Sequence, residues 1–317
     1  MVAWRMGSLK ILAMTTFRYH TADVFTDTRF GGNQLAVIPD ARGIPELLLL
    51  AIAREFNYAE TTFVYPPADP ANTRRLRIFT PGTEVPFAGH PTVGTAHVLA
   101  AIGAIPLAGD MTRIVFEEGV GPVSVAIRSR DGRPVFAQLS VAKLPEAGPV
   151  PASRAKLAAV LGLDVADLLD GQWAPQAFSC GIPFLFVPVV DREAVARVRI
   201  RTDAWESTQQ HAWAPDLFVF APGGEREGTD FHARCFVPGL GVPEDAATGS
   251  ANAALAGYLA ARDGRRDGTL RWRVEQGFEM HRPSVLEVEA DLAGGRLTAA
   301  RVGGASVLVC EGTMDVG

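Results

Sequence analysis

Two stretches of the chain are near copies of each other. RIFTPGTEVP begins at Arg77 and RCFVPGLGVP begins at Arg234, and 6 of their 10 positions are identical. The offset of 157 residues is close to half of the 317-residue chain. A repeat at this spacing predicts that one structural unit occurs twice, once in each half. The competing interpretation is chance similarity between two turns rich in Pro and Gly.

Each copy runs into a segment of small residues, AGHPTVGTAHVLAAIGA in the first half and TGSANAALAGYLAAR in the second. Their Ala and Leu content predicts two helices that pack tightly on several sides. The link from the repeat to the Gly that leads each segment is three residues longer in the second half. Apart from these three residues, each helix is expected at the same place in its own unit.

The stretches that flank these helices also correspond. RIVFEEGVGPVSVAIRSRDGR and RVEQGFEMHRPSVLEVEADLAGGR both alternate and are broken by Gly or Pro, which predicts antiparallel hairpins. Upstream, the strands YHTADVFT and QLAVIP precede the helical IPELLLLAIAREF. We match this set with the strands FAQLSVAKL and FLFVPVV and the helical SRAKLAAVLGL of the second half.

These patterns predict an α+β fold of two pseudo-symmetric domains, each a mostly antiparallel β-sheet wrapped around a central helix. We expect residues 16–130 together with 298–317 to form the first repeat domain and residues 131–297 to form the second. Residues 1–15 are expected to be a flexible leader, or to precede the true start of the protein. Their apolar core, Ile11 to Met14, is too short for a signal peptide. A ligand site is expected in the cleft between the domains.

Charge and cysteine content narrow the choice of partners. The net charge is -5, and no run of Lys and Arg is longer than two residues, so we expect neither nucleic acid nor a membrane surface as a partner. The three cysteines are widely spaced, which favours reduced thiols in the cytoplasm over disulfides or a zinc site. The histidines show no metal-ligand spacing, and we expect no metal.

The two predicted helix starts favour an anionic ligand, because a helix N-terminus offers free N–H groups and the positive end of a dipole. One lies at Gly89-His90 and the other at Gly249-Ser250. If a pseudo-twofold axis relates them, both could face one small carboxylate across the cleft, with Gly89 and Gly249 in contact with it.

Three ionisable residues are candidates for chemistry. Glu60, in NYAETTFVYP, begins a β-prone segment, where a partly desolvated carboxyl would have a raised pKa and could move a proton. His90 and Asp245 stand beside the two helix starts. Each has a plainer interpretation: a solvated strand-edge Glu, a solvent-facing His and an ordinary helix-start acid. Glu244 is interpreted as a solvated turn acid with no other task.

A set of motifs spread along the chain resembles the phenazine-biosynthesis PhzF-like family, within the diaminopimelate-epimerase-like fold. The motifs run from about Phe17 to the C-terminus. They are DVFTDTRFGGNQLAVI, NYAETTFV, RIFTPGTEVPFAGHPTVGTAHVL, CGIPFLFVPVV, EDAATGSANAALAGYL and EQGFEMHRPS. The resemblance implies two similar domains with the active site between them, a homodimer, and no cofactor.

The resemblance also implies roles for single residues. Glu60 would be the acid/base carboxyl, His90 its supporting histidine, and Asp245 the acidic partner. Gly249 and Ser250 would contact the substrate carboxylate. The best-known family member isomerises a dihydro-hydroxyanthranilate by moving a proton within the ring.

The sequence departs from the family pattern at three positions. Ala59 stands where the phenazine enzyme has Ser, which puts identity with the phenazine substrate in doubt. Ala246 stands where Pro is common, and His281 stands where Gly is usual. Amino-acid racemases of this fold use two thiols at the helix starts, whereas here these turns read AGHP and ATGS, which argues against a two-thiol epimerase.

We therefore predict a cofactor-independent isomerase that moves a proton within a small carboxylate-bearing substrate, similar to trans-2,3-dihydro-3-hydroxyanthranilate isomerase. Two alternatives stay open. One is a thiol-independent epimerase of an amino or hydroxy acid, which would invert a stereocentre. The other is a small-molecule-binding protein without turnover.

Overall fold

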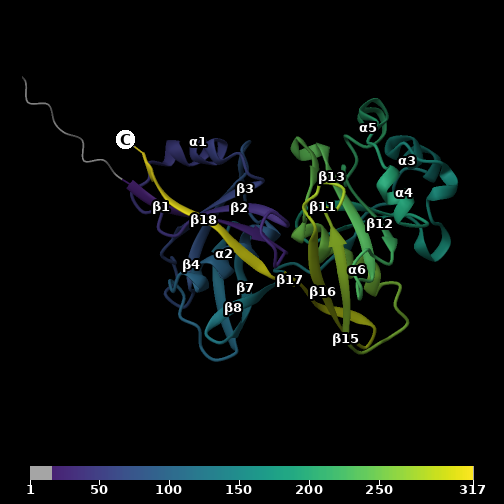
Figure 1. The fold of residues 1–317 in the computed structure, drawn as a ribbon. Helices are drawn as coiled ribbons and strands as arrows, with labels where there is room; N and C mark the ends of the chain where they lie inside the picture. Colours follow the sequence, from purple (N-terminus) through teal and green to yellow (C-terminus); the bar gives the residue numbers. More distant parts are fainter. Residues whose placement is uncertain (1–15, 317) are drawn as a thin grey trace, which may run out of the picture.

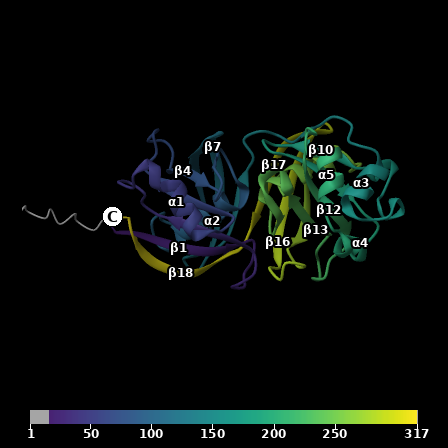
Figure 2. The same cartoon turned by 90° about the horizontal axis from the view of Figure 1, so that it is seen from above.

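The computed structural model describes residues 16–316, so the predicted leader at residues 1–15 lies outside the described residues. The two halves of the chain lie side by side, each with a long helix enclosed by strands (Figures 1 and 2). The last strand runs from the second half back to the first, where the C-terminus lies near the start of β1 (Figure 1).

The first half contains eight strands and two helices in the order β-β-α-β-β-β-α-β-β-β. Its elements are β1 (Thr16–Val24), β2 (Asn33–Ile38), α1 (Glu46–Phe56), β3 (Glu60–Tyr65), β4 (Arg74–Phe79), β5 (Glu84–Val85), α2 (Gly89–Ala101), β6 (Met111–Glu118), β7 (Gly121–Arg130) and β8 (Arg133–Ser140).

The rest of the chain adds short helices before it repeats the same series of strands. Its elements are β9 (Glu146–Ala147), α3 (Arg154–Leu161), η1 (Val165–Asp167), η2 (Gly171–Trp173), β10 (Gln176–Ser179), β11 (Pro183–Pro188), α4 (Arg192–Arg197), α5 (Thr202–Thr208), β12 (Asp216–Pro222), β13 (Phe231–Val237), η3 (Pro238–Leu240), β14 (Val242–Asp245), α6 (Gly249–Ala260), β15 (Gly268–Gln276), β16 (Ser284–Ala293), β17 (Arg296–Gly304) and β18 (Ser306–Asp315).

Strand pairing is the same in the two halves. In the first, β2–β3 and β4–β6 are parallel, and β1–β2, β3–β4, β6–β7 and β7–β8 are antiparallel. In the second, β11–β12 and β13–β15 are parallel, and β10–β11, β12–β13, β15–β16 and β16–β17 are antiparallel. The predicted α+β fold of two pseudo-symmetric, mostly antiparallel units is therefore confirmed.

One part of the predicted correspondence is wrong. FAQLSVAKL contributes to β8, which pairs with β7 and so completes the first half. Helix α4 follows β11 in the same way that α1 follows β2, so α4 is the counterpart of α1. Helix α3, in contrast, precedes β10. The alternating pattern of FAQLSVAKL identified a strand, but a pattern of period 2 does not say which neighbour the strand pairs with.

Strands β17 and β18 join the halves. β17 pairs with β16 along most of its length, and its residues Arg301–Gly304 also pair with β8. β18 then pairs with β1 in the first half. The domain boundary at residue 130 stays a prediction. A boundary after Ser140 would keep the β7–β8 hairpin within one domain.

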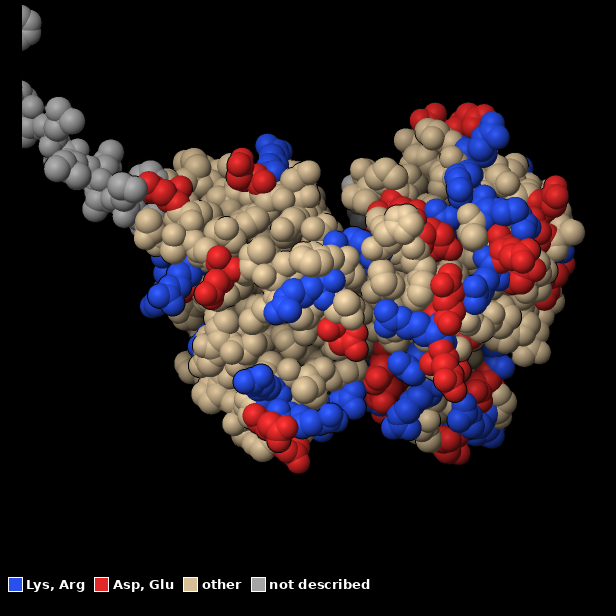
Figure 3. Space-filling model, in the orientation of Figure 1, with Lys and Arg blue, Asp and Glu red and all other residues tan. Residues whose placement is uncertain are grey.

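The two central helices are mostly apolar and are buried on all sides. Residues Gly89–Ala100 of α2 and all of α6 are buried, as expected for helices with a sheet wrapped around them. Among residues 16–316, no helix is both long and apolar enough to cross a membrane. On the face shown in Figure 3, acidic and basic side chains are interspersed and are densest over the second half.

Candidate active site

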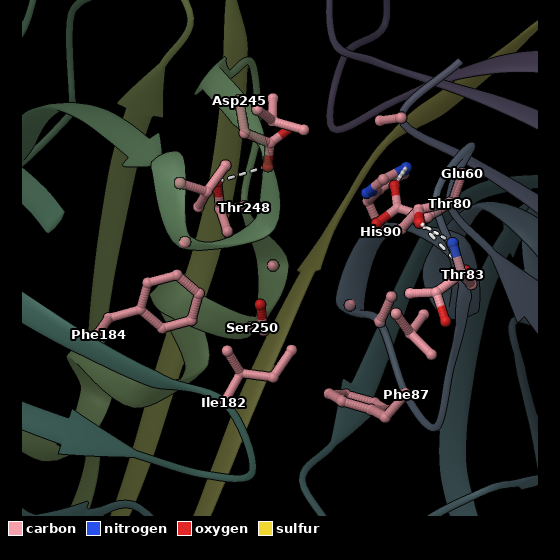
Figure 4. Close-up of a pocket in the computed structure, with 18 residues that line it drawn as sticks. Glu60, Thr80, Thr83, Phe87, His90, Ile182, Phe184, Asp245, Thr248 and Ser250 are labelled. Carbon is pink, nitrogen blue, oxygen red and sulfur yellow. Dashed lines mark hydrogen bonds and ion pairs between the residues drawn. The ribbon is translucent and has the colours of Figure 1, made fainter. Parts of the chain in front are cut away.

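A cavity of about 300 Å³ lies between the halves, at the starts of α2 and α6. Figure 4 shows side chains of the first half on one wall and side chains of the second half on the other. All six predicted site residues line it. The lining residues are Ala59, Glu60, Thr80, Thr83, Val85, Phe87, Ala88, Gly89, His90, Ile182, Phe184, Val237, Gly239, Val242, Asp245, Thr248, Gly249 and Ser250.

The two helix starts meet backbone to backbone. A Cβ placed on Gly89 would lie 2.7 Å from Cα of Gly249, and one on Gly249 would lie 3.0 Å from Cα of Gly89. Only glycine allows so close an approach. Neither helix has a side chain that caps its first turn, so the N–H groups at both starts remain available to an anion.

Glu60, the first residue of β3, projects into this space from the first half (Figure 4). Its side chain is 17% exposed, and Oε2 lies 3.2 Å from Nε2 of His90. Within the described chain, neither atom makes a hydrogen bond of good geometry. Burial raises the pKa of Glu60 well above its ordinary value, and the negative charge of Asp245 raises it further. The plainer interpretation of Glu60 as a solvated strand-edge acid is therefore wrong.

His90 is the second residue of α2 and is 4% exposed, so it does not face solvent. Burial lowers its pKa to about 3, and a backbone hydrogen bond with Gln34 opposes this only in part. Its ring is therefore neutral near neutral pH. Glu60 thus faces a neutral imidazole, which gives its carboxylate no ion-pair stabilisation.

Asp245, the last residue of β14, lies on the opposite wall and receives two side-chain hydrogen bonds. Asn33 Nδ2 donates to its Oδ1 at 2.8 Å, and Thr248 Oγ1 donates to its Oδ2 at 2.6 Å. Burial raises the pKa of Asp245, and these two hydrogen bonds lower it in part. Gln276 in turn donates to Thr248 Oγ1 at 2.9 Å and to the carbonyl of Asp245 at 2.8 Å. The turn before α6 is thereby fixed.

Ser250, the second residue of α6, presents a hydroxyl that has no hydrogen-bond partner among the described residues. The thiol of Cys180 lies behind it and donates to the carbonyl of Ser250 at 3.5 Å. Burial raises the pKa of Cys180 to about 12 and that of Cys235 well above its ordinary value. Both therefore stay protonated, and neither is suited to act as a thiolate base.

Comparison with known proteins gives a family over nearly the whole chain. The sequence model described as "Phenazine biosynthesis-like protein" matches residues 22–312. The chain belongs to this family. An uncharacterized isomerase of Mesorhizobium japonicum is 41% identical over 96% of this chain and 100% of its own. The trans-2,3-dihydro-3-hydroxyanthranilate isomerase of Pseudomonas aeruginosa is 34% identical over 93% of this chain and 98% of its own.

Solved structures agree. The Bacillus anthracis phenazine biosynthesis protein of the PhzF family superposes with a TM-score of 0.85 at 26% identity, covering 96% of this chain and all of the other. Both of these relatives of the phenazine biosynthesis-like protein are named isomerases, and the chain is an enzyme of the isomerase class. No group of three or more His, Cys, Asp or Glu in the described part of the protein is arranged to hold a metal ion.

Strand register shows which residues of this family member are equivalent in its two halves. Thr61 pairs with Phe79 in the first half, and Leu217 pairs with Phe236 in the second. Since Phe79 and Phe236 match in the repeat, Asp216 is the counterpart of Glu60. Its Oδ1 accepts a hydrogen bond from Gly239 N at 2.9 Å, and Asp216 does not line the cavity. The fold is thus nearly symmetric, whereas the site is not.

The same register corrects the prediction for Glu244. Ile78 pairs with Val85, and Cys235 pairs with Asp245, so Glu244 is the counterpart of Glu84 and the three extra residues lie before it. Arg234 grips Glu244 through Nε at 2.8 Å and Nη2 at 2.7 Å. Glu244 is therefore half of a mostly buried ion pair and is not a solvated turn acid.

Sequence reasoning missed Asn33 and Gln276, whose amides hold Asp245 and Thr248. Both lie inside motifs that carried the family resemblance, GGNQ and EQGF. A buried amide in a strand gives no periodic signal, and only its place next to a Gly turn marks it. His281 has φ +56°, which explains why a glycine suits that position.

Proposed function

We propose that the protein is a cofactor-independent isomerase that moves a proton within a small carboxylate-bearing substrate, with Glu60 as the acid/base group. The observation that carries this proposal is the state of Glu60. Its Oε2 has no hydrogen bond within residues 16–316, it borders the cavity, and its pKa is raised. These are the properties of a carboxyl that exchanges protons with a weak carbon acid near neutral pH.

The proton transfer is balanced by Glu60 alone. Its carboxylate takes a proton from a carbon next to an unsaturated system, and the electron pair of that C–H bond shifts the double bond. The carboxyl then returns the proton to a carbon at the far end of the system. Nothing is oxidised or reduced, and Glu60 ends in its starting form. Neutral His90, 3.2 Å from Glu60, leaves the carboxylate basic.

The substrate carboxylate fits the start of α6. The N–H groups of Gly249 and Ser250 have no side-chain cap, and the Ser250 hydroxyl is free to donate. Among the described residues that line the cavity, none is Lys or Arg. Hydrogen bonds from the backbone and Ser250, together with the helix dipole, are therefore the groups that would hold an anion here.

The asymmetry of the site supports a double-bond shift over inversion of a stereocentre. Inversion needs proton donors and acceptors on both faces of one carbon. The counterpart of Glu60 is Asp216, which hydrogen-bonds Gly239 N and stays out of the cavity. Asp245 does reach the second wall, but both of its oxygens already accept hydrogen bonds. A single cavity carboxyl with an oxygen that makes no hydrogen bond within residues 16–316 favours proton transfer on one face.

The substrate proposed for a first trial is the one named for the Pseudomonas aeruginosa relative, trans-2,3-dihydro-3-hydroxyanthranilate. Ala59 lines the cavity beside Glu60 and offers no side-chain hydrogen bond, so the natural substrate is proposed to differ from that compound near this wall. Related small unsaturated carboxylates belong in the same trial.

The test is solvent-deuterium incorporation into these compounds, followed by NMR. Wild-type protein should place deuterium at the carbon that receives the proton, and Glu60→Gln should lose at least about 100-fold of the rate. Glu118→Gln is the matched control, because Glu118 is also a buried carboxyl but does not line the cavity. Exchange by Glu60→Gln at the wild-type rate would exclude the role of Glu60. Loss of substrate chirality without a double-bond shift would identify an epimerase, and ligand-induced stabilisation without any exchange would identify a binding protein.

A further inference from the structure

Arg282 of the second half reaches into the first half. Its Nε donates to the carbonyl of Gly32 at 2.8 Å, and its Nη2 donates to the carbonyl of Gly31 at 2.6 Å. Nη2 also pairs with Asp23, whose other carboxylate oxygen accepts from Phe30 N at 2.6 Å. One guanidinium therefore holds two consecutive carbonyls and a carboxylate that is 5% exposed.

The turn that Arg282 holds has little freedom of its own. Gly32 has φ +63°, and a Cβ there would collide with the carbonyl oxygen of Val24. Gly32 N donates to the carbonyl of Pro283 at 3.1 Å, which adds a backbone link between the same two segments. The turn ends at Asn33, the first residue of β2, so the position of Arg282 fixes the start of that strand.

The side-chain amide of Asn33 in turn contacts the second half at the active site. Its Nδ2 donates to Oδ1 of Asp245 at 2.8 Å and to the carbonyl of Ala247 at 3.0 Å, and it faces Nδ1 of His90 at 3.2 Å. Asn33 is 3% exposed. The Asn33 amide thus contacts both walls of the cavity, one through Asp245 and the other through His90.

We infer that Arg282 is a positioning residue for the reaction: by holding the Gly31–Gly32 turn, it places the Asn33 amide where that amide orients Asp245 and His90 across the cavity. Arg282 does not line the cavity, so it acts through Asn33. The planar guanidinium suits this task because it can donate to several fixed acceptors at once. The inference rests on the proposed function for its kinetic consequence, and on geometry alone for its effect on His90.

The kinetic experiment compares Arg282→Met, Asn33→Ala and the double variant with Arg29→Met. Arg29 lies on the same loop and also donates to a carbonyl, that of Leu308 at 2.9 Å, but it has no link to Asn33. We expect kcat to fall by about 100-fold in Arg282→Met with KM within about threefold, since a displacement of about 1 Å is enough for such a loss. The double variant should be no slower than Asn33→Ala, and Arg29→Met should match wild type.

A second readout needs no substrate. The ¹⁵N shifts of the His90 ring, assigned with His90→Gln, should change in both Arg282→Met and Asn33→Ala and stay unchanged in Arg29→Met. If Arg282→Met fails to fold, Asp23→Asn replaces it, with a smaller change expected in both readouts. The inference is overturned if the His90 signals of a folded Arg282→Met match wild type, or if its kinetic loss adds fully to that of Asn33→Ala. A wild type without turnover would defeat the proposed function, while the His90 signals would still decide the inference.

Discussion

Gly89 and Gly249 touch each other where the two central helices begin, and this contact sets the width of the cavity. A Cβ on Gly89 would lie 2.7 Å from three backbone atoms, namely Cα and C of Gly249 and the N of Ser250. Backbone atoms at a helix start cannot move aside as a flexible side chain could. The contact therefore ties the separation of the two helix starts, and of the groups they carry, to the absence of a side chain.

Gly89→Ala should lower the free energy of unfolding by about 1–3 kcal/mol, the usual cost of overpacking, and should reduce activity in the molecules that remain folded. Gly249→Ala should cost less, because its nearest contacts are at 3.0 Å. Urea unfolding measures both. Gly264→Ala is the control, since a Cβ there meets nothing within 4 Å. Equal stability of Gly89→Ala and Gly264→Ala would contradict the tight contact.

Glu118 should make the protein less stable as pH rises. Thr92 Oγ1 lies 2.7 Å from both Glu118 Oε1 and the carbonyl of Ala88. When Glu118 is ionised, the single hydroxyl hydrogen of Thr92 is shared between these two acceptors. Protonated Glu118 can instead donate to Thr92 Oγ1 while Thr92 donates to the Ala88 carbonyl, so the protonated form satisfies both contacts. Burial raises its pKa from 4.5 to about 8. The folded state thus binds this proton more tightly than the unfolded chain does.

The stabilisation from this proton is complete below the unfolded pKa and is lost as pH rises to the folded value. Glu118→Gln has no titratable proton at this position, so it does not lose this stabilisation as pH rises. Its unfolding free energy relative to wild type should therefore increase between about pH 5 and 8, by at most about 1.4 kcal/mol per pH unit. Urea titrations across this range measure the slope. Glu117→Gln is the control, because hydrogen bonds from Asn72, Ala68 and Asp69 lower the pKa of Glu117. A difference that is flat with pH would show that Glu118 is ionised in the fold.

The repeated ion pair offers a comparison within one molecule. Arg234 stacks over Phe236 and grips Glu244, as Arg77 stacks over Phe79 and grips Glu84. The Arg234 and Glu244 side chains are 7% and 16% exposed. Those of Arg77 and Glu84 are 22% and 42% exposed, and Arg77 also pairs with Glu46. Glu244→Ala should therefore destabilise the protein by about 3 kcal/mol, because it leaves the buried charge of Arg234 without its ion-pair partner. Glu84→Ala should cost about 1 kcal/mol or less. Equal effects in urea unfolding would mean that solvent screens both pairs alike.

The case of Glu244 shows where sequence reasoning stops. The repeat beginning at Arg77 and Arg234 was enough to predict two similar α+β units, because shared turn residues and helix positions recur in order. The sequence alone, however, does not fix where the three extra residues lie. Aligning the letters placed them after Pro243, and strand pairing places them before Glu244. Only pairing reveals that Glu244 faces Arg234.

The residues of the candidate site likewise fall into those that the sequence could predict and those that it could not. Glu60, His90 and Asp245 were candidates because an acid in a β-prone segment or a polar residue at a helix start is visible in the sequence, and the family resemblance then implied their roles. Asn33 was not predicted, because its importance comes from contacts with residues 57 and 212 positions away. The close approach of Gly89 to Gly249 was likewise invisible, since each glycine alone is compatible with many roles.

The pH dependence of turnover tests the pair formed by Glu60 and Asp245. In the proposed mechanism Glu60 acts in its carboxylate form, so kcat/KM should fall as pH drops through the pKa of Glu60, which burial and then Asp245 raise well above 4.5. The pKa of His90 is lowered to about 3, so no second transition is expected near the ordinary histidine value of 6.5.

Asp245→Asn should lower kcat and also move the acid midpoint to lower pH, because it removes the negative charge that disfavours ionisation of Glu60. The shift of the midpoint separates this electrostatic effect from a loss of shape, which would reduce the rate equally at every pH. Glu118→Gln should leave the midpoint in place, since Glu118 contacts Thr92 outside the cavity. A wild-type profile that is flat between about pH 4 and 8, or a midpoint that rises in Asp245→Asn, would exclude Glu60 as the proton-transfer group with a pKa tuned by Asp245.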